Sequence, residues 1–193
     1  SQKTDMQNVG VHLSIDGSGN LWFVIKGDRA AVNGDTYIDV ELLQGSLSMT
    51  GVGGATGGFT TDAPDTSGGR FPGDMRFDVR FRTGGTLPII FISRWENVAG
   101  TYQYVNVDSA TNPALFNAIK TGVYIQGNAD STPVCYDAFG KNVYDPNAFV
   151  EAAINFTQII SAFAGGGNQE CLAFRTVFIR TKSSHAETAS LED

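Results

Sequence analysis

The sequence has few of the residues on which catalysis usually depends. Only two cysteines and two histidines occur in 193 residues. Histidine is the usual general base near neutral pH, yet neither His12 nor His185 accompanies a nucleophile motif such as G-x-S-x-G. Acidic residues are scattered, and aspartate is common in turns. We therefore expect a protein that is not an enzyme, although a site formed only in the fold would escape motif analysis.

The two cysteines, Cys135 and Cys171, do not have the spacing of a metal site. One disulfide between them and two separate thiols are both compatible with the sequence, because the sequence does not give the distance between their Cα atoms. Two buried thiols are the favoured interpretation, since free cysteines are commonly buried.

Positive charge and long apolar runs are also scarce. The chain has 13 Lys and Arg against 20 Asp and Glu, which gives a formal net charge of −7. Nucleic-acid binding needs a basic patch, and the one local concentration, Arg76, Arg80 and Arg82, contains Asp78. No run approaches the roughly 18 apolar residues of a membrane-spanning helix, and the first ten residues contain no apolar leader segment. We expect no nucleic-acid partner and no membrane span.

Glycine and phenylalanine, in contrast, are abundant, with 23 and 13 copies. Apolar and polar residues alternate in 11–15, 36–45 and 75–82, which is the pattern of half-buried strands. In 75–82, Phe77 and its apolar neighbours face one side and the arginines face the other. Further strands are expected at 21–27, 46–51, 87–95, 101–108, 122–128, 133–139 and 171–181.

Two segments carry helix signals. Residues 112–122 start with Asn112 and Pro113, which suit an N-cap and the first helical position. A second helix is expected over 145–165, which starts with Asp-Pro in the same way. Its apolar residues cover more than half of the helix circumference, more than one sheet face needs: Phe149, Val150, Ala152, Ala153, Ile154, Phe156, Ile159, Ile160 and Phe163.

These elements predict a mainly β fold, an antiparallel β-sandwich or flattened barrel of about 7–10 strands with one or two packed helices. We expect a single domain over 1–193, with a glycine-rich loop at 53–73 and a polar C-terminal tail at 182–193. Loops this long are uncommon in compact domains and usually functional. We expect this one to become ordered only against a neighbouring chain.

The favoured function is that of a structural subunit. The absence of catalytic motifs, the long loop and the wide apolar helix all favour a chain that assembles with copies of itself or with other subunits. The predicted architecture is similar to that of phage tail-tube and capsid-decoration proteins, which are β-sandwiches with a flanking helix. The expected setting is a virion, a phage tail, a capsid, a filament or another extracellular assembly.

A ligand-binding β-sandwich is the alternative function, because aromatic side chains can stack on sugars. Tyr102 and Tyr104 share one strand face, and Trp95 belongs to the preceding strand. These three residues are the candidate sugar-binding or ligand-binding site, although packing on a sheet surface explains most such aromatic pairs.

Calcium is the only cofactor that the sequence suggests. In the stretch DGSGN, the side chains of Asp16, Ser18 and Asn20 have the spacing of oxygen ligands in a calcium loop. A full EF-hand loop needs Glu at its twelfth position, where this chain has Gly27. A hairpin turn is the competing and favoured interpretation of the same residues.

Overall fold

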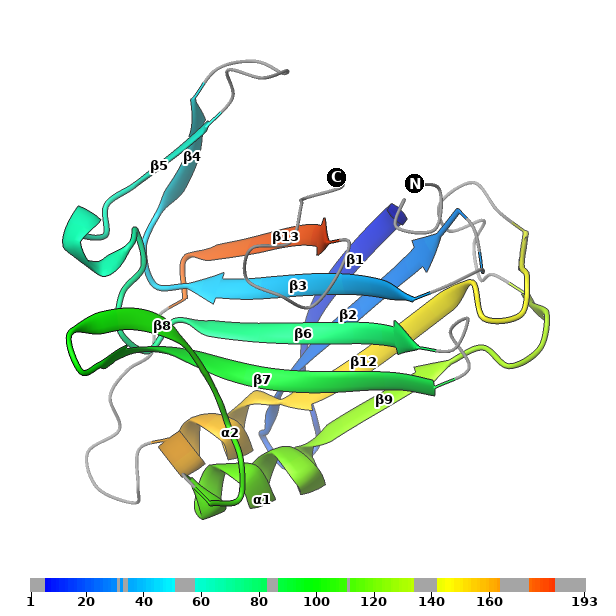
Figure 1. Cartoon of the computed structure of the whole chain (residues 1–193). Helices are drawn as coiled ribbons and strands as arrows, with labels where there is room; N and C mark the ends of the chain where they lie inside the picture. The colour runs from blue at the N-terminus through cyan, green and yellow to red at the C-terminus, as the bar shows by residue number, and fades with distance from the viewer. Residues whose placement is uncertain are drawn as a thin grey trace.

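Two antiparallel sheets pack against each other in the computed structural model, which describes residues 6–30, 32, 35–50, 58–82, 87–110, 112–133, 142–163 and 174–182 (Figure 1). The four-stranded sheet has the order β1 (Met6–Ile15), β2 (Leu21–Arg29), β12 (Phe149–Asn155) and β9 (Val123–Gly127). The five-stranded sheet has the order β13 (Thr176–Lys182), β3 (Thr36–Leu43), β6 (Met75–Arg82), β7 (Leu87–Val98) and β8 (Thr101–Asn106).

Short elements complete the described part of the chain. Two small hairpins pair β4 (Leu47–Thr50) with β5 (Gly58–Thr61) and β10 (Thr132–Pro133) with β11 (Val143–Tyr144). Helices α1 (Pro113–Gly122) and α2 (Phe156–Phe163) lie together at one end of the sandwich (Figure 1), and Asp65–Ser67 forms one 3-10 turn. The predicted mainly β, sandwich-like fold is confirmed, and nine strands form the two main sheets.

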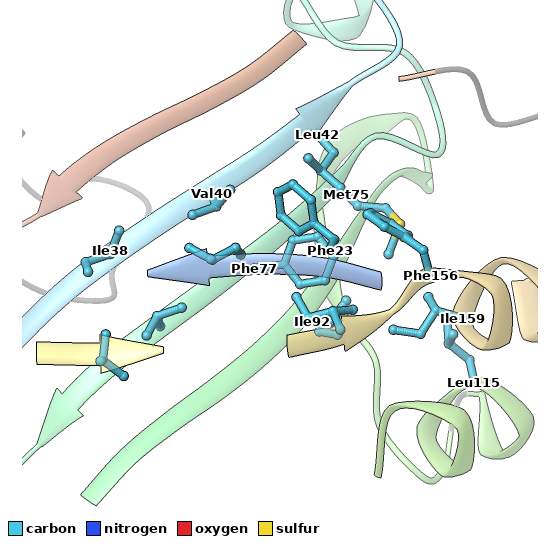
Figure 2. Packing of buried hydrophobic residues seen from close by; sticks show 14 residues of the cluster. Phe23, Ile38, Val40, Leu42, Met75, Phe77, Ile92, Leu115, Phe156 and Ile159 are labelled. Carbon is cyan, nitrogen blue, oxygen red and sulfur yellow. The ribbon is translucent and has the colours of Figure 1, made fainter. Parts of the chain in front are cut away.

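Alternating residues of both sheets form the core between them. Figure 2 shows Ile38, Val40 and Leu42 of β3 in one row that points toward the opposite sheet. At the centre Phe23 of β2 lies 6.3 Å from Phe77 of β6, measured between ring centroids. Phe156, the first residue of α2, lies 5.4 Å from Phe23 and 6.2 Å from Phe77. The three rings therefore join the two sheets to the helical end.

The expected first helix is confirmed in detail. Asn112 precedes α1, and its Oδ1 accepts a hydrogen bond of 3.1 Å from the Leu115 backbone N–H. Pro113 follows as the first helical residue, where its missing N–H leaves no intrahelical bond unmade. Leu115 is buried in the core cluster, so this cap fixes where the helix enters the core.

The expected second helix is only half correct. Residues 149–155 form β12 instead, which pairs with β2 on one side and β9 on the other. Val150, Ala152 and Ile154 alternate with residues that point away from the core, and all three are buried. The segment therefore forms a strand and not a helix, because its buried residues repeat every two positions and its backbone pairs with a strand on each side. The apolar surplus of a single helix, which favoured assembly, therefore does not exist.

The glycine-rich stretch also differs from the expected loop. Residues 58–61 form β5, and the Ser67 hydroxyl donates hydrogen bonds to the carbonyls of Pro64 at 2.8 Å and Arg70 at 2.6 Å. Residues 58–73 thus contain a strand and a 3-10 turn where a loop without secondary structure was expected, and the dependence of their order on a neighbouring chain stays a prediction. Residues 53–57 lie outside the described part.

Several predictions concern parts of the chain that the structure does not describe. They are the strand at 133–139 beyond Pro133, both cysteines, His185 and the tail from residue 183 onward. Neither helix in the described ranges is long and apolar enough to cross a membrane.

Candidate functional site

The outward side of the five-stranded sheet carries buried charges. Asp39 and Glu41 of β3 are 0% exposed and Asp78 of β6 is 2% exposed. Alternation predicts a solvent-facing polar side for these strands, but here both sides are buried. We call the following cluster the charged face: Asp39, Glu41, Arg70, Arg76, Asp78, Arg80, Arg180 and Lys182.

Five members of the charged face form a chain of alternating charge. Arg70 binds Glu41 through two hydrogen bonds, Nε to Oε2 at 2.7 Å and Nη2 to Oε1 at 3.0 Å. The Nη2 of Arg180 lies 2.8 Å from Glu41 Oε1 and 3.0 Å from Asp39 Oδ2. Lys182 Nζ lies 2.8 Å from the same Asp39 oxygen. The chain begins and ends with a cation, so three cations share two carboxylates.

Two carboxylates of the charged face lie opposite each other. Asp39 and Asp78 are register partners on β3 and β6, and the Oδ1 atom of each is buried without a hydrogen bond. Burial raises the pKa of Asp78, the charge of Asp39 adds to this rise, and the guanidinium of Arg80 opposes it. Among the pockets found between described residues, none is lined by Asp39 or Asp78.

The three predicted aromatic residues do lie together, next to the charged face. Trp95 of β7 meets Tyr104 of β8 edge-on, with ring centroids 4.9 Å apart, and stacks on Tyr102 at 6.5 Å. Gly68 follows the 3-10 turn with a left-handed φ of 67°, and a Cβ there would lie 3.1 Å from the Trp95 ring. Glycine at this position lets the 64–70 segment approach the indole closely.

The polar atoms of Trp95 and Tyr104 are already used within the chain. The Tyr104 hydroxyl donates to Glu41 Oε2 at 2.9 Å, and the Trp95 indole N–H donates to the Ser67 carbonyl at 2.9 Å. Burial, followed by the charge of Glu41, raises the pKa of Tyr104. The guanidinium of Arg70 lies 5.2 Å from the Trp95 ring centroid. Sugar binding at these rings stays a prediction, and Trp95 and Tyr102 have the part-exposed faces for it.

The DGSGN stretch is a turn between β1 and β2. The carboxylate of Asp16 accepts hydrogen bonds from the Ser18 backbone N–H, from the backbone and side chain of Asn20, and from the Trp22 indole, at 2.8 to 2.9 Å. The Trp22 bond, followed by those of Asn20, lowers the pKa of Asp16. Calcium stays a prediction here, and the ion would have to displace N–H donors that now meet this carboxylate.

The described ranges contain no group of three or more His, Cys, Asp or Glu side chains arranged to hold a metal ion.

The β4–β5 hairpin projects from the sandwich (Figure 1). Its register places Leu47, Met49 and Phe59 on one side and Ser48, Thr50 and Thr60 on the other. Met49 is 73% exposed and Phe59 is 51% exposed. No charged residue occurs between positions 45 and 61. The hairpin is thus an uncharged arm with one apolar side, and most of that side faces solvent.

A pocket of about 250 Å³ lies where the base of the hairpin meets the five-stranded sheet. On one side Phe59 contacts Phe178 of β13 edge-on, with ring centroids 5.2 Å apart. The pocket is lined by Leu43, Leu47, Phe59, Thr61, Gly68, Gly69, Arg70, Phe178 and Arg180. Two arginines of the charged face therefore open onto a mostly apolar space.

Strand β1 forms an edge of the four-stranded sheet. Its ten residues include no Asp, Glu, Lys or Arg. Val11, Leu13 and Ile15 are 45%, 59% and 72% exposed, although their register places Val11 and Leu13 opposite the buried Ile25 and Phe23. The core-facing side of β1 therefore continues past the cover that the other sheet provides, and His12 is exposed on the opposite side.

No family model matches the chain, and neither a curated protein nor a solved structure matches it. Its function is therefore inferred from the surfaces described above.

Proposed function

We propose that this chain is a non-enzymatic structural subunit that assembles with further copies of itself. The observation that carries the proposal is the uncharged β4–β5 hairpin, which projects from the sandwich and leaves Met49 73% exposed and Phe59 51% exposed. A two-stranded hairpin is only marginally stable by itself in water. Contact with a second chain would bury its apolar side and pair its free edges.

The edge of β1 is the surface that suits this hairpin. Natural proteins protect edge strands with charges, prolines or short length, whereas β1 has ten residues and none of these charges. The edge strand β13 of the other sheet, in contrast, carries Arg180 and Lys182. In a chain of net charge −7, two uncharged segments can approach without the repulsion that separates like-charged copies.

The proposed contact is therefore strand addition between copies. The hairpin of one copy extends the four-stranded sheet of the next at β1, and Met49 and Phe59 cover Leu13 and Ile15. Because the two surfaces differ, the contact is heterologous, and repetition gives rings or filaments. Filaments, phage tail tubes and capsids are the assemblies in which we place such a subunit.

Native mass spectrometry over a range of protein concentrations tests this contact. We expect the wild type to exceed the monomer mass, and Met49→Asp and Leu13→Asp each to stay monomeric with unchanged circular dichroism. Val98→Asp, at the exposed β7–β8 turn, is the matched control and should assemble like the wild type.

Mixing the two monomeric variants sharpens the test. Met49→Asp keeps the β1 edge intact and Leu13→Asp keeps the hairpin intact. A one-to-one heterodimer should therefore form and should grow no further. A wild type that remains a monomer at every concentration would exclude the proposed function. Growth that survives both substitutions would exclude the proposed surfaces.

A ligand-binding module is the second candidate function, favoured by the part-exposed rings of Trp95 and Tyr102 beside a cationic group. A glycan array read with and without a calcium chelator tests it. Binding by a monomeric wild type that is lost in Trp95→Ala would support this function over assembly.

A further inference from the structure

We propose that the pocket beneath the β4–β5 hairpin binds a small molecule that carries one carboxylate on an apolar body. The pocket holds about 250 Å³ between the hairpin base, β3 and β13. This inference goes beyond the proposed function, since the pocket belongs to a single copy and shares only Phe59 with the proposed contact.

The charges around the pocket favour an anion. Along the chain Arg70–Glu41–Arg180–Asp39–Lys182, three cations share two carboxylates. Lys182 is 1% exposed at one end, whereas the side chains of Arg70 and Arg180 are 21% and 16% exposed and line the pocket. Buried charge is stable when it is paired. Among these three cations, the two that can meet a ligand are therefore the arginines at the pocket.

The two arginines also have N–H donors that can bind a ligand. Arg70 and Arg180 use their Nε and Nη2 groups to bind carboxylates of the charged face, and among the described residues neither Nη1 group makes a hydrogen bond. No acidic residue lines the pocket. Glu41 is wholly buried and binds both guanidiniums, so it holds them in place before a ligand arrives. Charge-assisted hydrogen bonds from arginine to a carboxylate are among the stronger ones in proteins.

The remaining walls define the rest of the ligand. Leu43, Leu47, Phe59 and Phe178 supply apolar surface around the arginines. An apolar body attached to the carboxylate would bury this surface, as ligands do in mostly apolar pockets with few polar groups.

Binding of hexanoate, measured by calorimetry, tests the proposal. Acetate tests the contribution of the apolar body, and hexanol and hexylamine test that of the negative charge. We expect hexanoate to bind at least about tenfold more tightly than each of the other three probes. Equal binding of hexanol and hexanoate would overturn the proposal.

A pair of variants at Leu47 locates the site. Leu47 lines the pocket outside the ion-pair chain, so its replacement leaves Glu41 and both arginines paired. Leu47→Asp should weaken hexanoate binding by about tenfold or more through like-charge repulsion, whereas the matched Leu47→Asn should weaken it less. Hexanoate binding that is the same in all three proteins would refute the site.

Two further comparisons identify the source of the carboxylate and distinguish ligand binding from assembly. A short peptide ending in leucine is compared with its C-terminal amide, because a chain terminus offers the same chemistry as a free acid. Preference for the free terminus over hexanoate supports a peptide source, and the reverse supports a small acid. Every measurement is repeated on Leu13→Asp, in which binding should persist; loss of binding there would contradict a site within one copy.

Discussion

At β3 the two sides of the five-stranded sheet differ in chemistry but not in burial. Val40 on the core side is 0% exposed, and its neighbours Asp39 and Glu41 on the outward side are 0% exposed as well. The core side is stabilised by apolar packing that requires no specific partner. The outward side is stabilised by ion pairs, in which each charge depends on another. Alternation along a strand therefore shows which residues share a side, and it leaves open whether that side meets water.

The two sides also differ in the kind of substitution that destabilises them. On the core side an added charge is costly because nothing there can pair with it. On the outward side a removed charge is costly because its partners stay buried. The three predictions below test this contrast.

The largest effect is expected on the core side, for Phe77→Asp. Phe77 is 0% exposed and packs between Phe23 and Phe156, so the new carboxylate would be buried without a partner. We expect the free energy of unfolding to fall by about 4 kcal/mol or more, measured by denaturant titration. The exposed control Val98→Asp should change it by about 0.5 kcal/mol or less. Equal effects of the two substitutions would show that Phe77 does not face the core.

The next effect is expected on the outward side, for Glu41→Gln. This change keeps the shape of the side chain but leaves Arg70 and Arg180 without their shared carboxylate. We expect a loss of about 3 kcal/mol in the free energy of unfolding. Replacing all three residues together, Glu41→Leu with Arg70→Met and Arg180→Met, should restore most of that loss, because no charge then lacks a partner. A triple variant less stable than Glu41→Gln would mean that these charges add stability beyond their mutual pairing.

Local sequence predicts only part of this architecture. Alternation in 36–43 and 75–82 predicts β3 and β6 with their correct sides, and Asn112 with Pro113 predicts α1. The failure at 149–155 has a physical cause. Apolar residues there satisfy both a period of two and a helical period, and pairing with β2 and β9 decides between them.

The candidate sites also differ in whether local sequence predicts them. The grouping of Trp95, Tyr102 and Tyr104 follows from strand alternation and the order of two neighbouring strands. The pairing of Arg70 with Glu41 joins positions 29 residues apart, and it arises only when the 62–74 segment folds over the outward side. No local pattern carries that information, so the pocket beneath the hairpin is visible only in the fold.

The smallest effect concerns pH and the outward carboxylates. Burial raises the pKa of Asp78 above its ordinary value of 3.8, so the folded chain holds this proton more tightly than the unfolded chain does. Between 3.8 and the raised pKa the folded state binds more protons, and the stability that Asp78 contributes falls as pH rises through this window. The stability of wild type relative to Asp78→Asn should therefore be greatest at the acidic end and decline with rising pH.

Asp16→Asn is the matched control, because its expected pH dependence has the opposite sign. Hydrogen bonds from Trp22 and Asn20 lower the pKa of Asp16. The stability that Asp16 contributes is therefore present above pH 3.8 and is lost as pH falls toward the lowered pKa. Denaturant titrations of the three proteins from pH 3 to pH 6 should thus give slopes of opposite sign for the two differences. The same sign for both would mean that burial does not govern Asp78, and that its side of the sheet is solvated like the β1–β2 turn.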